Sequence, residues 1–332
     1  MAEKILVTGA NGHLGNNLVR ALCAQGKTVS AGIRQTSNKT TLEGLDCEII
    51  PFDMVDRASV AAAMEGVTTV YHVAAVFRHW ARHPVKEIIQ PNLDGTRNVL
   101  ELAAQKGVAK VVYVSSIAAL DYAQVPMNES TWNTITSDPY IHAKMLSEKL
   151  AWELAKSLGL NMVSVLPAAI VGPNLGDHLT PTMGFLAHVL SNTARFDVNF
   201  TMNYVHVEDV VAGMIAATEN GKNGSRYILG NELPLTSGRV FEIAKTILPH
   251  IRKPPLIDKA SLLQMAKTLE AASRESGQEP LLTSYGVELY YDADTRLDTS
   301  RAQKELGFSP RNPEEAIQQA LKYLIQRFAP GI

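Results

Sequence analysis

The chain holds a tyrosine and a lysine spaced for proton transfer, in the segment Tyr140-Ile-His-Ala-Lys144. The surrounding pattern predicts a helix over 139–157, with Ser137 or Asp138 as its N-cap. Residues four apart share one face of a helix, so we expect the Lys144 ammonium beside the Tyr140 phenol. A positive charge there favours the phenolate and lowers the pKa of the phenol from its ordinary value of about 10. The spacing therefore predicts a proton donor that works near neutral pH.

Two serines, Ser115 and Ser116, end a short apolar strand that the pattern predicts over 110–114. In open α/β sheets, ligands bind at the carboxyl ends of the strands. One loop is enough to bring Ser116 to Tyr140. We therefore expect a serine hydroxyl and a phenol to meet at that edge of a sheet.

A glycine-rich turn follows the apolar strand predicted over 4–8 and precedes a helix predicted over 12–24. Gly9 permits the tight turn, Gly12 lets the backbone approach a pyrophosphate, and Gly15 lets the helix pack on the strand. The free N–H groups at the start of the helix attract an anion. The pattern predicts a dinucleotide site, with an incidental glycine-rich turn as the alternative. The residues assigned to cofactor binding here are Gly9, Asn11, Gly12, His13, Leu14 and Gly15.

The segment after the second predicted strand favours NADP(H) over NAD. An NAD site usually places an acid there for the ribose 2′-hydroxyl, and residues 31–39 contain none. Arg34 can instead form a forked pair with a 2′-phosphate, assisted by Ser37 and Lys39. The alternative is a solvated basic loop.

Asp53 and Met54 follow the third predicted strand. Asp53 is placed to accept a hydrogen bond from the adenine amino group, and we assign both residues to the cofactor site. The alternative for Asp53 is a turn or helix-capping role.

The first half of the chain alternates short apolar runs with helical segments. Strands separated by helices pair in parallel through right-handed crossovers, which predicts an α/β fold with a doubly wound parallel sheet. The strands are expected over 4–8, 28–33, 48–51, 69–74, 110–115 and 161–167, and the helices over 12–24, 57–64, 84–105 and 139–157. Residues 225–229 are expected to extend the sheet.

The pattern becomes irregular after about residue 174, where longer loops and scattered helices predict a smaller C-terminal α+β substrate lobe. Helices are expected there over 237–247, 259–272 and 313–327. The predicted cofactor domain covers 1–173 with 204–230 returning to it, and the lobe covers mainly 174–203 and 231–332.

Composition excludes several classes of protein. The 332 residues are 46% hydrophobic and 19% charged with a net charge of −2, which is typical of a globular chain and gives no basic field for nucleic acid. Cys23 and Cys47 have no metal-ligand spacing and suit a reducing compartment. The uncharged stretch 157–176 is interrupted by prolines and glycines, so a buried strand explains it better than a membrane span. We expect a cytoplasmic protein without a secretory signal or membrane contact.

The chain resembles the extended short-chain dehydrogenase/reductases, and within them most closely the branch of dihydroflavonol reductases and aldehyde/ketone reductases. The resemblance extends over nearly the whole chain. Its motifs are Gly9-Ala-Asn-Gly12-His-Leu-Gly15, His72-Val-Ala-Ala75, Asn92-Leu-Asp-Gly-Thr-Arg-Asn-Val-Leu100, Val114-Ser-Ser116, Tyr140 with Lys144, Leu166-Pro-Ala-Ala-Ile-Val-Gly-Pro173, Tyr204-Val-His-Val-Glu-Asp209 and the tail 298–310.

The resemblance implies a Rossmann-type sheet and specific residue roles. Tyr140 would donate the proton, Lys144 would hold the nicotinamide ribose, and Ser116 would bond the substrate oxygen. Val73, Ala74 and Ala75 would border the cofactor ribose and phosphates, and Pro167 and Ile170 would line the nicotinamide. Homodimers are common in the family, and the helices predicted over 84–105 and 139–157 resemble its usual interface.

The substrate is expected beside the nicotinamide, which the segment after the fourth predicted strand should overhang. The segment 76–83 leaves the sheet edge with aromatic and cationic side chains, although a packing role for them is an equal alternative. The expected substrate contacts are Phe77, Trp80, Phe200 and Tyr204, with Phe196 and Trp132 as further aromatic residues of an apolar pocket. His79 and His83 have the spacing of a zinc pair but no evident third ligand, so we expect no metal.

Three functions compete. The first is NADPH-dependent reduction of a ketone or aldehyde by Ser116, Tyr140 and Lys144. The second is NAD(P)-dependent sugar-nucleotide epimerisation or dehydration, whose enzymes commonly carry an Asn where this chain reads Leu166-Pro-Ala-Ala-Ile170. The third is a non-catalytic NADP-binding sensor, although such proteins usually lack the catalytic Tyr or Lys. We expect the reductase.

Overall fold

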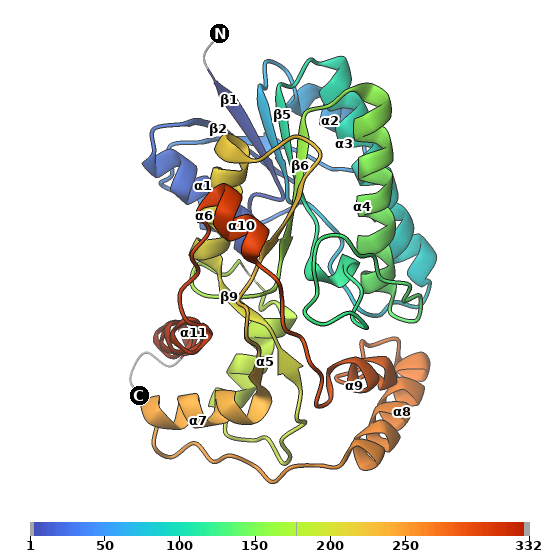
Figure 1. The fold of residues 1–332 in the computed structure, drawn as a ribbon, viewed down its shortest axis with the longest axis vertical. Helices are drawn as coiled ribbons and strands as arrows, with labels where there is room; N and C mark the ends of the chain where they lie inside the picture. Colours follow the sequence, from blue (N-terminus) through green and yellow to red (C-terminus); the bar gives the residue numbers. More distant parts are fainter. Residues whose placement is uncertain (1–2, 177, 329–332) are drawn as a thin grey trace.

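The computed structural model describes residues 3–176 and 178–328. Its centre is a seven-stranded sheet in which every strand pairs in parallel, in the order β10-β6-β5-β4-β1-β2-β3 (Figure 1). The strands are β1 (Lys4–Thr8), β2 (Thr28–Ile33), β3 (Glu48–Pro51), β4 (Thr69–His72), β5 (Lys110–Val114), β6 (Met162–Pro167) and β10 (Arg226–Leu229). This is the doubly wound, Rossmann-type α/β sheet that the alternating pattern predicted.

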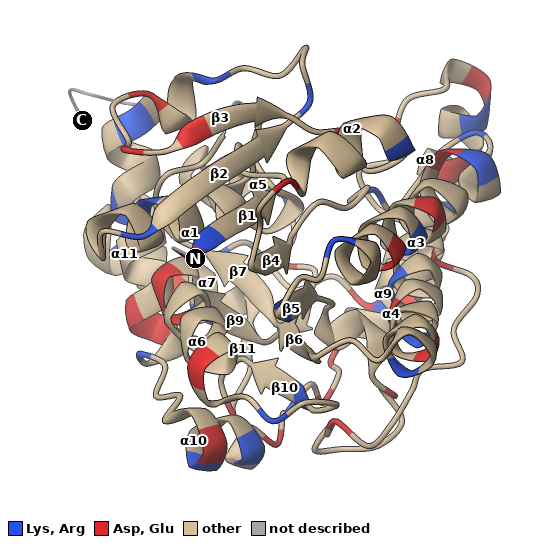
Figure 2. Cartoon of the chain, turned by 90° about the horizontal axis from the view of Figure 1, so that it is seen from above, with Lys and Arg blue, Asp and Glu red and all other residues tan. Residues whose placement is uncertain are grey.

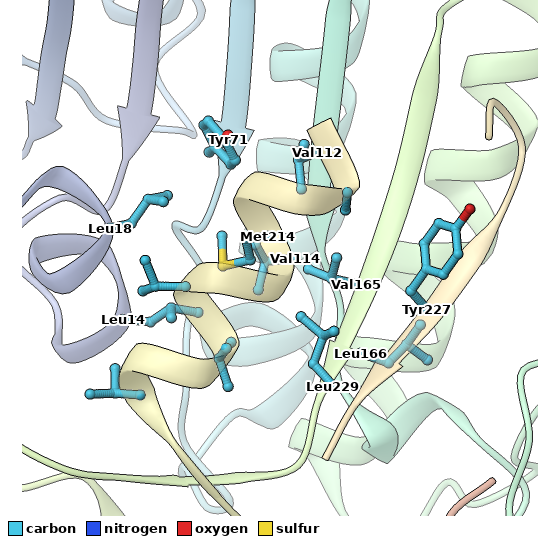
Figure 3. Packing of buried hydrophobic residues seen from close by; sticks show 14 of the residues in the cluster. Leu14, Leu18, Tyr71, Val112, Val114, Val165, Leu166, Met214, Tyr227 and Leu229 are labelled. Atoms are coloured by element: carbon cyan, nitrogen blue, oxygen red, sulfur yellow. The ribbon is translucent and has the colours of Figure 1, made fainter. Parts of the chain in front are cut away.

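Helices cover both faces of the sheet, because the central strands are apolar on both sides. One face carries α1 (His13–Ala24) and α6 (Val207–Asn220), and the other carries α2 (Arg57–Ala63), α3 (Gln90–Gln105) and α4 (Pro139–Leu158). Figure 3 shows Met214 of α6 packed between Leu14 and Leu18 of α1 and Val114 of β5. Burying a side chain of that size stabilises the fold by about 1.5–3 kcal/mol.

The C-terminal lobe lies beyond the carboxyl ends of the strands (Figure 1). It contains the pairs β7 (Ala169–Val171) with β9 (Tyr204–His206) and β8 (Thr201–Met202) with β11 (Leu235–Thr236). Its helices are α5 (Pro181–Leu190), α7 (Ser237–Ile247), α8 (Lys259–Ser276), α9 (Ser284–Tyr290) and α11 (Pro313–Phe328). The first two and α11 share one hydrophobic cluster, while α8 and α9 share another.

The structure differs from the predicted elements at several points. Helices α5, α6, α9 and the short α10 (Ser300–Leu306) were not predicted, and α10 packs on α6 and β10 of the sheet domain instead of on the lobe. The helix predicted over 84–105 begins as a π-helical turn, Val85–Ile89. Two 3-10 turns, Thr40–Leu42 and Ile117–Ala119, lie in the connections.

Charged residues of both signs are interspersed along the helices and loops around the strands, for example in α8 and α10 (Figure 2). In the part of the chain that the structure describes, no helix combines the length and the apolar character that crossing a membrane requires.

Candidate active site

Four segments meet at the carboxyl edge of the sheet, and each delivers one part of the site. The turn after β1 brings the glycines, the segment after β4 brings residues 73–80, the end of β5 brings Ser116, and the first turn of α4 brings Tyr140. Parallel strands present their carboxyl ends to the same side, which is why residues far apart in the sequence converge here.

Tyr140 is fixed by the start of α4. The helix begins after Asp138, whose side chain caps it by accepting from the Ile141 N–H at 2.9 Å. The Ser116 hydroxyl lies close enough to the phenol to lower its pKa, and it accepts from the Ala118 N–H at 3.1 Å. The predicted meeting of a serine and the phenol therefore occurs, and Asp138 is the N-cap instead of Ser137.

The predicted lowering of the Tyr140 pKa is wrong for this arrangement. Burial raises the pKa of the phenol, and the nearby Ser116 hydroxyl opposes that effect only in part. The Lys144 ammonium donates to the Val114 carbonyl at 3.2 Å. Burial lowers the pKa of Lys144 from 10.5 to about 8, against the opposing charge of Glu148. Desolvation thus outweighs the expected attraction between the two side chains.

Ser115 has a different environment from Ser116. Its hydroxyl is buried and donates to the Glu148 carboxylate at 2.7 Å. The same carboxylate accepts from the Ser164 hydroxyl at 2.7 Å and forms two 2.9 Å hydrogen bonds with Arg226. This buried network joins α4 to β5, β6 and β10, one turn beyond Lys144.

Sequence reasoning missed the Glu148 and Arg226 pair, although a signal existed. Glu148 lies four residues after Lys144 and so shares its inward face of α4. The guanidinium of Arg226 also stacks on the Trp132 ring, 3.8 Å from its centroid. Trp132 therefore covers this ion pair, and its assignment to the substrate pocket is not supported.

The glycine turn fits a dinucleotide. Gly9 has a φ of +66°, and a Cβ there would stand 2.9 Å from the Ala74 Cα. A Cβ on Gly15 would overlap the Gly9 carbonyl. Gly12 caps α1, and no side chain of the described residues hydrogen-bonds as a cap there, so the first-turn N–H groups are available to an anion such as a pyrophosphate.

Two side chains of the turn face inward. His13 contacts the Pro173 carbonyl through Nε2 at 3.0 Å, and burial lowers its pKa to about 4, so the ring is neutral. Leu14 packs in the sheet core. Both residues can thus serve a cofactor through their backbone only. Asn11 donates to the Asn38 carbonyl at 3.4 Å and joins the turn to the basic loop.

The basic loop presents the residues expected to select NADP(H). Arg34 and Lys39 are exposed and Ser37 is half-buried, with its N–H donating to the Arg34 carbonyl at 2.9 Å. Asp53 accepts from the Val55 N–H at 3.1 Å, which is the turn role kept as its alternative. Met54 packs against Gly95 of α3.

The remaining predicted cofactor residues lie along the same edge. The Thr8 hydroxyl accepts from the N–H groups of Val73 and Ala74, both at 3.0 Å, and so fixes the segment after β4. Ala75 is exposed. Pro167 is buried at the end of β6, and Ile170 is half-buried on β7.

Two of the predicted substrate residues lie against other aromatic rings, and another is buried in the C-terminal lobe. Phe77 lies against the Tyr140 ring, with 4.6 Å between centroids, and Phe200 lies 6.0 Å from the Tyr290 ring. Trp80 is half-buried. Tyr204 is 1% exposed and belongs to the cluster of α5, α7 and α11, so we withdraw it as a substrate contact. Phe196 is exposed.

Three tyrosines near Tyr140 escaped sequence reasoning. The rings of Tyr122 and Tyr290 lie edge to face, with 6.5 Å between their centroids. Tyr285 and Tyr290 both lie on α9. Because α9 is distant in sequence from α4, no local pattern revealed that these tyrosines lie near Tyr140. Within residues 3–176 and 178–328, no group of three His, Cys, Asp or Glu side chains is placed to hold a metal.

Comparison with known proteins finds a matching family and several similar proteins. Residues 5–230 match the model of the NAD dependent epimerase/dehydratase family. Sterol demethylase protein B of Methylococcus capsulatus is 32% identical over 329 residues, covering 97% of this chain and 98% of the relative. A putative dihydroflavonol 4-reductase of Synechocystis sp. is 31% identical over 342 residues, covering 99% and 95%. The crystal structure of gox2253 superimposes with a TM-score of 0.82 at 30% identity, covering 98% and 99%.

Proposed function

Because the chain belongs to the NAD dependent epimerase/dehydratase family, whose members use a nicotinamide dinucleotide, we propose that it is an NADPH-dependent reductase that converts a ketone or aldehyde to an alcohol. The observation that carries the proposal is the convergence of the Tyr140 phenol and the Ser116 hydroxyl at the sheet edge, one helical turn from Lys144. Reductases among the relatives support the class of reaction.

The bound cofactor would supply a hydride from its reduced nicotinamide. The first-turn N–H groups of α1 would hold its pyrophosphate, and Lys144 would hold the nicotinamide ribose. Arg34, Ser37 and Lys39 would bind the 2′-phosphate, which is the reason for proposing NADPH instead of NADH.

The two hydroxyls would act on the carbonyl oxygen of the substrate. Ser116 donates a hydrogen bond to that oxygen, and Tyr140 donates its proton as negative charge develops there. Burial keeps the pKa of Tyr140 above its ordinary value, so the phenol is protonated at neutral pH. One hydride and one proton added across the C=O bond give the alcohol, and the phenolate regains its proton from solvent.

Sugar-nucleotide epimerisation or dehydration is the competing function, and two features favour reduction. The segment Pro167-Ala-Ala-Ile170 has no side-chain amide that could contact a nucleotide diphosphate. The surroundings of Tyr140 are aromatic, with Phe77 in ring contact and Tyr122 and Tyr290 nearby. We further propose that the protein is cytoplasmic. We also propose that it forms a homodimer through α3 and α4, and light scattering tests whether the dimer forms.

The test is an NADPH-oxidation screen with three substrate groups: aromatic aldehydes and ketones including a dihydroflavonol, a ketosteroid, and UDP-sugars. A reductase consumes NADPH with a member of the first two groups, and Tyr140→Phe loses turnover by about 10²–10⁴-fold while keeping NADPH affinity. Conversion of a UDP-sugar without net NADPH consumption, or unchanged turnover in Tyr140→Phe, contradicts the proposal.

A further inference from the structure

The loop after β4 is fixed at both ends, so the side chains between those ends have defined positions. The buried Asn92 amide accepts from the Val76 N–H at 2.9 Å and donates to the Val76 carbonyl at 3.1 Å. At the other end, the His83 N–H donates to Glu87 at 2.8 Å.

His79, in the middle of this loop, is held by a carboxylate. Its Nδ1 lies 2.8 Å from Oδ2 of Asp138, whose other oxygen caps α4 through the Ile141 N–H. The Asp138 side chain is 6% exposed and that of His79 is 29% exposed. A carboxylate only accepts, so the shared proton belongs to Nδ1 of His79. In the neutral ring, Nε2 is then an acceptor.

The imidazole borders the proposed reaction centre. Its ring centroid is 4.9 Å from that of Tyr140 and 5.8 Å from that of Phe77. The Tyr285 hydroxyl of α9 is buried without a hydrogen-bond partner among the described residues, and burial raises its pKa, with a smaller contribution from the charge of Asp138. Polar groups beyond Ser116 and Tyr140 therefore exist in surroundings that are otherwise aromatic.

We propose that His79, oriented by Asp138, is a specificity residue whose Nε2 accepts a hydrogen bond from a hydroxyl on the substrate close to the reacting carbonyl. The preferred substrates are then hydroxy ketones or hydroxy aldehydes. The inference rests on the proposed function and adds to it a second point of recognition. A site built to bond a hydroxyl favours the substrate that carries it over the analogue without one, because the analogue leaves the polar group without a partner.

The alternative for the pair is a purely structural connection between the loop and α4. That role predicts equal losses on every substrate when His79 is changed. Substrate recognition predicts a loss only on substrates with the hydroxyl. The ratio of kcat/KM values for two matched ketones therefore separates the roles.

The experiment uses acetophenone and α-hydroxyacetophenone with NADPH and the full chain. We expect the unmodified protein to prefer the hydroxy ketone by about 10-fold, the value of one hydrogen bond. His79→Phe keeps a planar ring against Tyr140 and should bring the ratio near one, with acetophenone reduced as before. The matched control His83→Phe, on the exposed side chain at the end of the loop, should keep the preference.

Asp138→Asn provides a second variant, because asparagine still caps the helix but no longer fixes the tautomer of His79. It should lower the ratio with little change in NADPH affinity. Equal losses on both ketones in either variant overturn the inference. If the unmodified protein reduces both ketones equally, the inference alone fails. If it reduces no carbonyl compound, the proposed function fails with it.

Discussion

The Lys144 ammonium donates to the main-chain carbonyl of Val114, at 3.2 Å, from the helix that also presents Tyr140. The lysine is therefore tied to the end of β5, the strand that leads into Ser116. This bond only partly replaces the water that the half-buried ammonium has lost, and desolvation lowers the pKa of Lys144 to about 8.

The desolvated Lys144 ammonium should cost stability that a neutral side chain recovers. Below pH 8 both the folded and the unfolded chain carry the proton, so the full cost of burial is present; it disappears as pH rises from about 8 to 10.5, where only the unfolded chain stays protonated. Lys144→Met should raise the free energy of unfolding at pH 7 by about 1–3 kcal/mol and abolish turnover. Urea denaturation checks the gain, which should shrink with rising pH. The control is Lys156→Met, an exposed lysine of α4; an equal gain there would exclude burial as the cause.

Removing one member of the buried pair should be costly. Glu148→Leu leaves the Arg226 guanidinium without its carboxylate and should lower the free energy of unfolding by about 3–5 kcal/mol. Replacing both residues by leucine should cost less than Glu148→Leu alone. The exposed ion pair of Asp294 and Arg296 gives the contrast. Asp294→Asn should change the free energy of unfolding by less than about 1 kcal/mol. Additive losses in the double variant would show that the pair is not coupled.

A methyl group should be rejected at Gly15 of the glycine turn but tolerated at Gly184 of α5. Gly15→Ala forces a carbon into the Gly9 carbonyl, so we expect a loss of about 1–3 kcal/mol in stability and weaker NADPH binding by fluorescence titration. Gly184→Ala in α5 meets open space and should be neutral or stabilise the helix by up to about 1 kcal/mol. Full NADPH affinity in Gly15→Ala would place the cofactor elsewhere.

Arg34 should decide the preference between the two nicotinamide cofactors. Arg34→Gln removes a charge-assisted contact with the 2′-phosphate, so kcat/KM for NADPH should fall by about 10- to 100-fold while that for NADH changes little. Lys39→Gln should show the same direction with a smaller effect. Steady-state kinetics with both cofactors measures the ratio. An equal loss with NADPH and NADH would return Arg34 to the role of a solvated loop residue.

Local sequence was sufficient for the parallel sheet, the glycine turn and the proximity of Tyr140 to Ser116. Apolar periodicity and turn chemistry act over a few residues, so they are readable without the fold. Short or largely apolar helices were harder to predict from the sequence. Helices α9 and α10 have only seven residues each, and α6 is apolar over most of its surface, so none of them shows a clear helical periodicity.

Only the tertiary structure decided the direction of the pKa shift at Tyr140, the burial of Tyr204 and the contact between His79 and Asp138. Spacing along a helix places a charge near a phenol, but segments distant in the chain determine how much water both groups lose. Desolvation depends on everything packed around a group, and here it outweighs the neighbouring charge that the sequence made visible.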